Sequence, residues 1–395
     1  MTGRRARAAV AAVVAVAVVA IAVVVLTGGG SPHPRARPRL TPAALRAALP
    51  APTSQVFGVN VNRLFDDMTY SPAQIDAQLA GVRATGATVA RSDAFWEAAE
   101  PQAPVDGRHR YAWSFDDRVA AALAAHGLTW LPIIDYTAPW AQSVPGQDHS
   151  PPRPSAVADY AAYAGAFAAR YGSGGSFWRA HPELTPAPVT AIEIWNEPDN
   201  PEFWVPGPDA AAYARMYLAA RAGVDAADPA IRVLVGGLTN PSAFLPAMVQ
   251  AVPQLVGHVD GVAVHPYGTP SVVQNRVRGA RAALVSVGMN SVPLYVTEFG
   301  WTTQPAGATG YAPAAQRPTD ITTVLTALGH LRCGLAATLL YTWVTPEHNP
   351  GDSQDWYGIA NPADPSAATP DTAAFAAGLR AAAAPDATPP APCAT

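Results

Sequence analysis

The sequence predicts an α/β protein built as a single (β/α)8 TIM barrel, preceded by an N-terminal transmembrane signal anchor and a tether. Two observations predict the barrel: apolar, β-branched runs alternate with amphipathic helical stretches, and eight of each fit into about 330 residues. A long apolar run near the N-terminus predicts the anchor. A doubly wound open sheet competes with the barrel, but no Gly-x-Gly-x-x-Gly follows the first strand, so a dinucleotide-binding version has little support.

The first element is the apolar run Ala8–Leu26, which three arginines precede. Its length, about 19 residues, is close to the roughly 20 that cross a bilayer as a helix. The run ends in Thr-Gly-Gly-Gly, a weak cleavage site, so an uncleaved anchor is favoured over a cleaved signal peptide. In both cases we expect export: a membrane-anchored chain with an extracytoplasmic domain, or a secreted one if the segment is cleaved.

The chain therefore divides into an anchor (1–27), a Pro/Gly/Arg-rich linker (28–50), the barrel domain (51–384) and an Ala/Pro-rich tail (385–395). Two cysteines remain, Cys333 and Cys393. In an oxidising compartment they can pair and hold the tail, but the sequence does not establish the geometry, and a buried thiol with a free tail thiol is the favoured alternative.

The elements of the barrel domain follow one another in strict alternation. The expected strands are Val56–Val61, Thr88–Ser92, Thr129–Asp135, Thr190–Trp195, Arg232–Gly237, Gly261–His265, Leu294–Glu298 and Ala336–Trp343. Ser71 can cap the first helix, Ser114 can start the second, and Gly127 can stop it. The expected helices are Pro72–Thr85, Phe115–His126, Ala156–Tyr171, Pro208–Asp225, Pro241–Val252, Val272–Val287, Thr319–Arg332 and Thr372–Ala384.

Composition excludes several kinds of protein. The 395 residues are 49% hydrophobic and 14% charged, and the formal net charge is −4. A nucleic-acid binder would carry a dense basic face, so we expect no nucleic-acid partner. All 25 cationic residues are arginine, which excludes P-loop and Schiff-base chemistry, because both need lysine.

Two carboxylates mark the ends of the fourth and seventh strands. Glu197 lies in Trp-Asn-Glu-Pro at 195–198, and Glu298 lies in Thr-Glu-Phe-Gly-Trp at 297–301. The active site of such a barrel lies at the carboxyl ends of its strands. Two carboxylates at one barrel mouth are what glycosidic cleavage needs, one to protonate the leaving oxygen and one across the sugar. The structural alternative is a loop-capping Glu197 and an ion-paired Glu298.

These two motifs resemble those of the clan A retaining glycoside hydrolases, over residues from about 55 to 380. The clan includes the family 5 and family 39 (β/α)8 enzymes. The third-strand segment from Asp135 lacks a histidine that several family 5 members place there, which favours the family 39-like branch. The resemblance implies Glu197 as acid/base and Glu298 as nucleophile, with retention through a covalent intermediate.

The resemblance also implies supporting residues. Arg91 would hydrogen-bond to the nucleophile, although a purely structural pair with Glu193 is the alternative. Asn196 would donate to the sugar 2-hydroxyl. Tyr267 would donate to the nucleophile, whereas His265 is as easily a satisfied core histidine.

Aromatic side chains at the mouth are the other sugar signature, since indole rings stack on the apolar faces of sugars. The resemblance implies Trp343 as a platform under the reacting sugar. Trp301 and Trp140 lie in loops that follow strands and are further candidates for lining the site. A tryptophan in a loop often only anchors that loop, so this alternative stays open.

The expected function is hydrolysis of O-glycosidic bonds in an extracellular or cell-envelope oligo- or polysaccharide, with endo-action favoured. We expect no cofactor and no metal, because the histidines show no ligand-like spacing. Two alternatives remain: a membrane-tethered glycan-binding pseudoenzyme, and a transglycosylase that uses the same intermediate. The sequence does not determine the sugar, the linkage or the oligomeric state.

Overall fold

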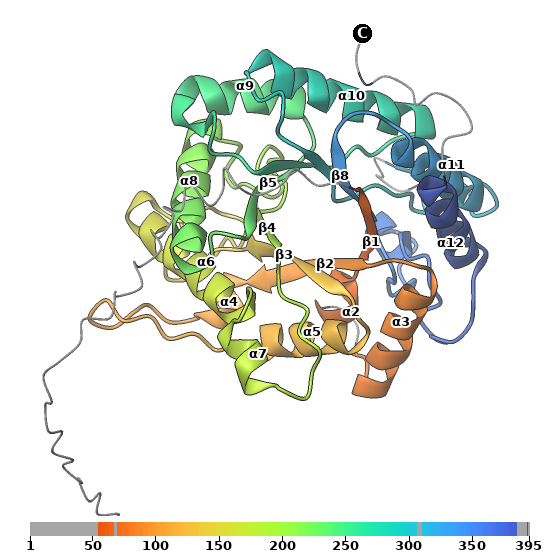
Figure 1. The fold of residues 1–395 in the computed structure, drawn as a ribbon, viewed down its shortest axis with the longest axis horizontal. Helices are drawn as coiled ribbons and strands as arrows, with labels where there is room; N and C mark the ends of the chain where they lie inside the picture. Colours follow the sequence, from red (N-terminus) through yellow and green to blue (C-terminus); the bar gives the residue numbers. More distant parts are fainter. Residues whose placement is uncertain (1–53, 67–68, 306–309, 385–392, 394–395) are drawn as a thin grey trace, which may run out of the picture. The chain divides into compact units, whose positions relative to one another are not determined.

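The computed structural model describes residues 54–66, 69–305, 310–384 and 393. Within them the chain forms a closed barrel of parallel strands in sequence order, which confirms the predicted architecture (Figure 1). The strands are β1 (Val56–Asn60), β2 (Val89–Phe95), β3 (Thr129–Asp135), β4 (Ala191–Ile194), β5 (Arg232–Leu238), β6 (Gly261–Val264), β7 (Leu294–Val296) and β8 (Leu335–Leu340).

Helices surround the barrel, and each of the eight expected from the sequence is present. They are α3 (Pro72–Ala84), α5 (Ser114–Ala125), α6 (Val157–Tyr171), α8 (Ala210–Ala227), α9 (Pro241–Ala251), α10 (Pro270–Ser286), α11 (Arg317–Gly329) and α12 (Pro370–Ala383). The sequence analysis missed shorter elements in the connections: α2 (Asn62–Asp66), α4 (Trp96–Ala99), α7 (Ser176–Ala180), and the 3₁₀ turns Pro154–Ala156, Pro253–Leu255 and Ser353–Trp356.

Local sequence explains where the first two long helices begin and end. Ser71 caps α3, and its side chain and that of Gln74 form a capping box. Ser114 is the first residue of α5 rather than its cap, and Trp113 precedes it without a side-chain cap. Gly127 follows α5 with φ 63°, a left-handed conformation that glycine adopts at little cost.

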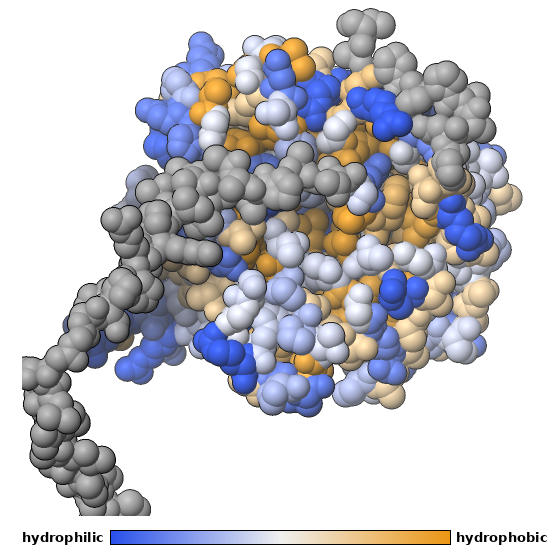
Figure 2. Space-filling view, in the orientation of Figure 1, coloured by the Kyte–Doolittle hydropathy of each residue, from blue (hydrophilic) through white to orange (hydrophobic). Residues whose placement is uncertain are grey.

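The core has two parts, one on each side of the strands. The larger part packs the outer faces of the strands against the helices. Side chains inside the barrel form the smaller part: Leu131, Leu234, Ala263, Tyr295, Ala336, Ala337 and Leu339. This interior plug makes the barrel a packed core rather than a pore, so a ligand is bound at a mouth. On the face shown in Figure 2, hydrophilic residues gather at the periphery and hydrophobic residues toward the middle.

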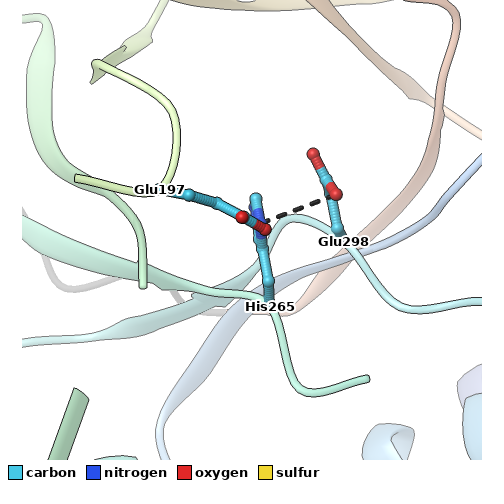
Figure 3. Close-up of side chains that lie close together, drawn as sticks. All are labelled: Glu197, His265 and Glu298. Atoms are coloured by element: carbon cyan, nitrogen blue, oxygen red, sulfur yellow. Dashed lines mark hydrogen bonds and ion pairs between the residues drawn. The ribbon is translucent and has the colours of Figure 1, made fainter. Parts of the chain in front are cut away.

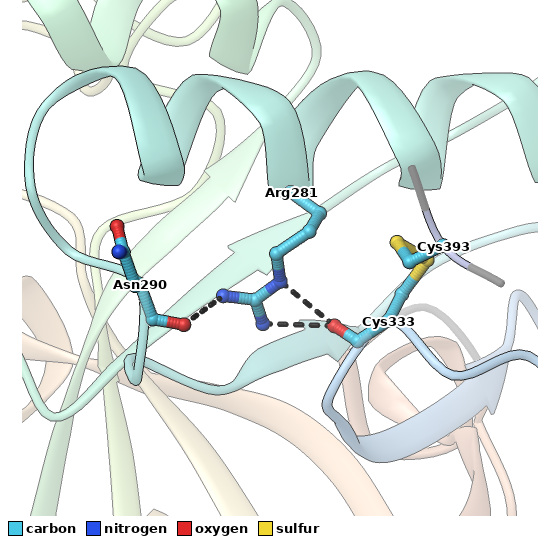
Figure 4. Close-up of a disulfide and its surroundings, with 4 residues drawn as sticks. All are labelled: Arg281, Asn290, Cys333 and Cys393. Carbon is cyan, nitrogen blue, oxygen red and sulfur yellow. Dashed lines mark hydrogen bonds between the residues drawn. A yellow bond between two sulfur atoms is a disulfide. The ribbon is translucent and has the colours of Figure 1, made fainter. Parts of the chain in front are cut away.

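The two cysteines form a disulfide between Cys333, just before β8, and Cys393. The Arg281 guanidinium donates two hydrogen bonds, of 2.9 and 2.8 Å, to the carbonyl oxygen of Cys333 and a third to that of Asn290 (Figure 4). The expected anchor and linker lie outside the described residues. Among the residues that are described, no helix combines the length and hydrophobicity needed to span a membrane.

Candidate active site

Glu197 reaches the barrel mouth through an unusual turn after β4. Trp195 and Glu197 have φ values of 67° and 44°, a left-handed conformation that costs a non-glycine residue of order 1–3 kcal/mol. Gly236 on β5 makes room for this turn, since a Cβ there would lie 2.1 Å from the carbonyl oxygen of Trp195. The Trp195 indole donates to the carbonyl oxygen of Phe203 and so fixes the turn. Strain held in this way is typical of functional sites.

Glu298 faces Glu197 across the mouth. It follows β7 by two residues, and both glutamates line one cavity of about 1230 Å³. Figure 3 shows the two side chains and His265 pointing toward one another. A carboxylate oxygen of Glu197 and one of Glu298 lie within 4.8 Å of each other. The structure therefore brings together the two carboxylates that the sequence singled out.

Arg91 on β2 contacts both the nucleophile candidate and a buried acid. Its Nη1 lies 2.6 Å from Oε1 of Glu298, and its Nε and Nη2 donate to the two oxygens of Glu193 at 2.9 and 3.1 Å. Nη2 also donates to Oδ1 of Asn196, at 3.1 Å. The two roles weighed for Arg91, contact with Glu298 and pairing with Glu193, thus coexist in one guanidinium.

Tyr267 and His265 follow β6 and contact the two glutamates of the site. The Tyr267 hydroxyl donates to Oε2 of Glu298 at 2.7 Å. Nδ1 of His265 lies 2.7 Å from Oε1 of Glu197, and its Nε2 lies 3.1 Å from Oγ1 of Thr297. His265 is therefore a buried, satisfied histidine that also contacts a candidate catalytic carboxylate.

The charges around Glu298 favour its ionised form. Burial by itself raises the pKa of Glu298, but the charges of His265 and Arg91 and the hydrogen bonds from Tyr267 and Arg91 outweigh burial, so the net pKa is lowered. Burial conversely lowers the pKa of His265, and the carboxylates of Glu298 and Glu197 outweigh it and raise that pKa. An ionised carboxylate is what a nucleophile requires.

Glu197, His265 and Glu298 are also the group of described residues whose donor atoms lie close enough to hold a metal ion. Each of these donor atoms already has a protein partner, and Arg91 lies 2.6 Å from Glu298. A fixed guanidinium at that distance repels a divalent cation. The arrangement suits proton transfer and nucleophilic attack better than metal binding.

The three tryptophans proposed for the mouth lie elsewhere. Trp343 is 2% exposed, and its indole donates to Gln78 on α3 instead of lining the cavity. Trp301 donates to the carbonyl oxygen of Gly268, and Trp140 to that of Glu100. All three anchor loops or pack in the core, which was the alternative left open. The expectation of a Trp343 platform is not met because β8 ends at Leu340, three residues earlier than expected.

Tyrosine, phenylalanine and histidine side chains, rather than the three predicted tryptophans, line the mouth. The aromatic residues that line the cavity are Phe95, Tyr136, His149, Phe203, His265, Tyr267, Tyr341 and Tyr357. The sequence analysis did not single out Tyr341, which directly follows β8, because it placed the end of that strand at Trp343. It also missed Asn200, whose amide donates to Oε2 of Glu197 at 2.7 Å, and Asp93. Asn200 lies three residues after Glu197, so its proximity was a usable signal.

The fold is similar to those of several solved enzymes. A monomeric β-xylosidase from Caulobacter crescentus CB15 matches with a TM-score of 0.62 and 21% identity, over 83% of this chain and 69% of that one. A GH39 enzyme from Xanthomonas axonopodis pv. citri matches with a TM-score of 0.61 and 18% identity, over 84% and 67%. This barrel has the fold of the clan A glycoside hydrolases.

A fungal β-1,4-galactanase extends the similarity to another member of that clan. Its TM-score is 0.55 at 16% identity, over 82% of this chain and 99% of that one. No protein-family model and no curated protein sequence matches this chain. The (β/α)8 fold that the resemblance implied is thus confirmed, and the activity rests on the geometry of the site.

Proposed function

We propose that this chain is a retaining glycoside hydrolase with Glu298 as nucleophile and Glu197 as acid/base. The observation that carries the proposal is the approach of their carboxylate oxygens to within 4.8 Å. Retaining enzymes hold the two carboxyl groups about 5–5.5 Å apart, whereas inverting enzymes need about 6.5–9.5 Å to admit a water. The clan A fold supports the same conclusion.

In the first step, Glu298 attacks the anomeric carbon and Glu197 gives its proton to the departing glycosidic oxygen. The bond from the anomeric carbon to that oxygen breaks as an ester to Glu298 forms. Arg91 and Tyr267 each hold one oxygen of Glu298 and thereby set the direction of attack.

In the second step, Glu197 takes a proton from water, and the water oxygen displaces Glu298 from the anomeric carbon. Two inversions give net retention. Asn200 and His265 hold the two oxygens of Glu197 and so keep it in place for both proton transfers.

We also propose that the substrate is an extracellular or cell-envelope oligo- or polysaccharide, and that the enzyme cleaves internal bonds of this glycan (endo-action). A cavity of about 1230 Å³ exceeds the roughly 300–1,000 Å³ of small-molecule sites, which supports several sugars at once. The Cys333–Cys393 disulfide supports export, because disulfides persist in oxidising compartments. Anchoring by residues 1–27 remains part of this proposal.

The proposal is tested with Glu298→Gln and Glu197→Gln on aryl glycosides and envelope polysaccharide. Loss of the nucleophile lowers kcat roughly 10⁴-fold or more. Loss of the acid/base costs about 10²–10⁴-fold, and least on substrates whose leaving group needs no proton. Glu202→Gln is the matched control, since Glu202 lines the same cavity without contacting either catalytic carboxylate.

Three outcomes separate the alternatives. Equal rates for the wild type and Glu298→Gln would contradict an enzyme that uses this nucleophile. Glycan binding without turnover by either protein would instead indicate a binding protein. Products with an added sugar acceptor, analysed by mass spectrometry, distinguish transglycosylation from hydrolysis, since both use the same intermediate.

A further inference from the structure

The cavity continues past the two glutamates along two arcs of the barrel. Glu197 follows β4 and Glu298 follows β7, so one arc contains β5 and β6 and the other contains β8, β1, β2 and β3. The proton donor marks where the leaving group departs, and Glu197 is held by His265, which follows β6. The other arc is lined by residues we call the polar end: Asn62, Arg63, Asp66, Asp93 and Gln354.

Within the polar end, Asp93 has the position that a sugar ring would reach first. It lies on β2 two residues after Arg91, so both side chains share one strand face, about 6.6 Å apart along the strand toward the mouth. Arg91 itself contacts Glu298 and Asn196. A ring with its anomeric carbon at Glu298 and its 2-hydroxyl near Asn196 therefore extends over Arg91 toward Asp93.

Asp93 is a carboxyl group that lines the cavity while only 7% exposed. Burial and, to a smaller extent, the charge of Glu298 raise the pKa of Asp93 to about 6, against the lowering effects of Arg91 and of a hydrogen bond with Asp66. Asp135 on the neighbouring strand β3 is fully buried, and burial followed by the charge of Asp93 raises the pKa of Asp135 well above its usual value. Above about pH 6, Asp93 therefore presents an ionised acceptor to the cavity.

We propose that Asp93 is a specificity-determining residue, which accepts a hydrogen bond from a hydroxyl on the third or fourth carbon of a neutral sugar bound at Glu298. The inference rests on the proposed function, because it needs a sugar in that place. A buried carboxylate pairs well with a sugar hydroxyl and repels a uronic acid. Arg63 does not reverse this preference, since it forms an ion pair with Asp355 at 3.2 Å.

The test compares wild type with Asp93→Ala on the aryl glycoside turned over fastest and on analogues lacking the hydroxyl of the third or fourth carbon. For one analogue, kcat/KM of the wild type falls about 10–100-fold, as expected for loss of a hydrogen bond to a charged group. Asp93→Ala has already lost this hydrogen bond. The kcat/KM of this variant is therefore less than about threefold lower for the same analogue than for the parent glycoside. An equal penalty in both proteins at both positions would overturn the proposal.

A matched control and a variant-free measurement complete the test. Asp199→Asn changes a carboxyl group at the β5–β6 end of the cavity, so the loss of kcat/KM with the analogue stays as in the wild type.

Fluorine at the critical position accepts hydrogen bonds but does not donate them. If Asp93 is the acceptor, the fluorinated analogue is as poor for the wild type as the one that lacks the hydroxyl. Recovery of activity by fluorine would assign that hydroxyl to a donor such as Gln354 and overturn the proposal.

The result also separates this inference from the proposed function. A wild-type chain that cleaves no glycoside refutes the proposed function itself. A wild-type chain that cleaves glycosides but prefers an aryl glucuronide to the matching glucoside refutes only the role of Asp93, since an ionised acid there repels the uronate.

Discussion

At the scale of single residues, one guanidinium connects the stability of the barrel with its chemistry. Arg91 is fully buried and contacts Glu193, Glu298, Asn196 and Asn60 at once. Asn60 continues this network, because its amide donates to the carbonyl oxygens of Thr297 and Leu340. These two residues lie far along the sequence, at the ends of β7 and β8. Glu298 is thus held by a hydrogen-bond network that also joins β1 to β2 and β8, the neighbouring strands in the barrel.

Replacing Arg91 should therefore cost stability. Arg91→Met leaves Glu193 buried without a counter-ion, and removing one partner of a buried pair costs about 3–5 kcal/mol in free energy of unfolding. Urea titration at neutral pH measures this loss.

The loss should also depend on pH, because the folded-state pKa of Glu298 is lowered. The contribution of ionised Glu298 to the free energy of unfolding is present above the unfolded pKa of about 4.3 and is lost as the pH falls through the folded value. The deficit of the variant should shrink over that range.

Arg276→Met serves as the control for this experiment, since Arg276 is exposed on α10 and should change stability by less than about 0.5 kcal/mol. A loss for Arg91→Met no larger than that of the control would show that Glu193 does not depend on this partner.

Tyr267→Phe should move the acidic limb of the pH profile. Its hydroxyl donates to Glu298 and helps to lower the pKa of that carboxyl, and a hydrogen bond to a charged group is worth about one to two pH units. Glu298 must be ionised for attack, so kcat/KM, measured against pH, should begin to fall at a higher pH in the variant. Tyr357→Phe is the neighbouring control, because that ring packs on Tyr267 and its hydroxyl donates to the carbonyl oxygen of Gly310. An unchanged limb in Tyr267→Phe would contradict the assigned contact.

At the scale of elements, the strands were predictable and the loops that follow them were not. Eight strands and eight long helices follow from apolar runs and helix caps, which are local properties of the sequence. The end of β8 was placed too late because Tyr341, Thr342 and Trp343 are as apolar and β-prone as the strand itself. Trp343 turns toward α3, where Gly81 leaves space for its ring, and this is a contact between distant parts of the chain.

Gly237 on β5 makes room for His265, which follows β6. A Cβ at this residue would lie 2.0 Å from Nε2 of His265, so β5 is shaped to leave room for that histidine. Gly237→Ala should displace His265 from Glu197, and a displacement of about 1 Å costs roughly 10²-fold in kcat/KM. Gly207→Ala, where nothing lies within 4 Å, is the control and should retain activity. Full activity of a folded Gly237→Ala would show that His265 has no part in holding Glu197.

The disulfide should stabilise the fold without affecting catalysis. It joins cysteines 60 residues apart, at the edge of the barrel where β8 begins and thus opposite the glutamates. Cys393→Ser should lower the free energy of unfolding by about 4 kcal/mol through loop entropy, while kcat/KM at low temperature stays unchanged. Reduction of the wild type by dithiothreitol should reproduce this shift in urea titrations, and equal stability of the two redox forms would contradict it.

At the scale of the whole molecule, the barrel separates stability from function. One end is filled by the interior plug and held by the disulfide, and the other carries strained backbone, buried charge and the cavity. The two glutamates could be located from the sequence because each directly follows a predicted strand, and the resemblance carried by their motifs pointed to Arg91, Asn196 and Tyr267. Asp93, Asn200 and Tyr341 required the structure, since their part in the cavity depends on how separate loops and strands assemble.

The stereochemistry of the reaction tests the central claim most directly. The two carboxylates approach to within 4.8 Å, which leaves no room for a water between nucleophile and sugar. Proton NMR of the first product, recorded before mutarotation, should show the anomeric configuration of the substrate. An initial product of opposite configuration would contradict the assignment of Glu298 as the attacking group.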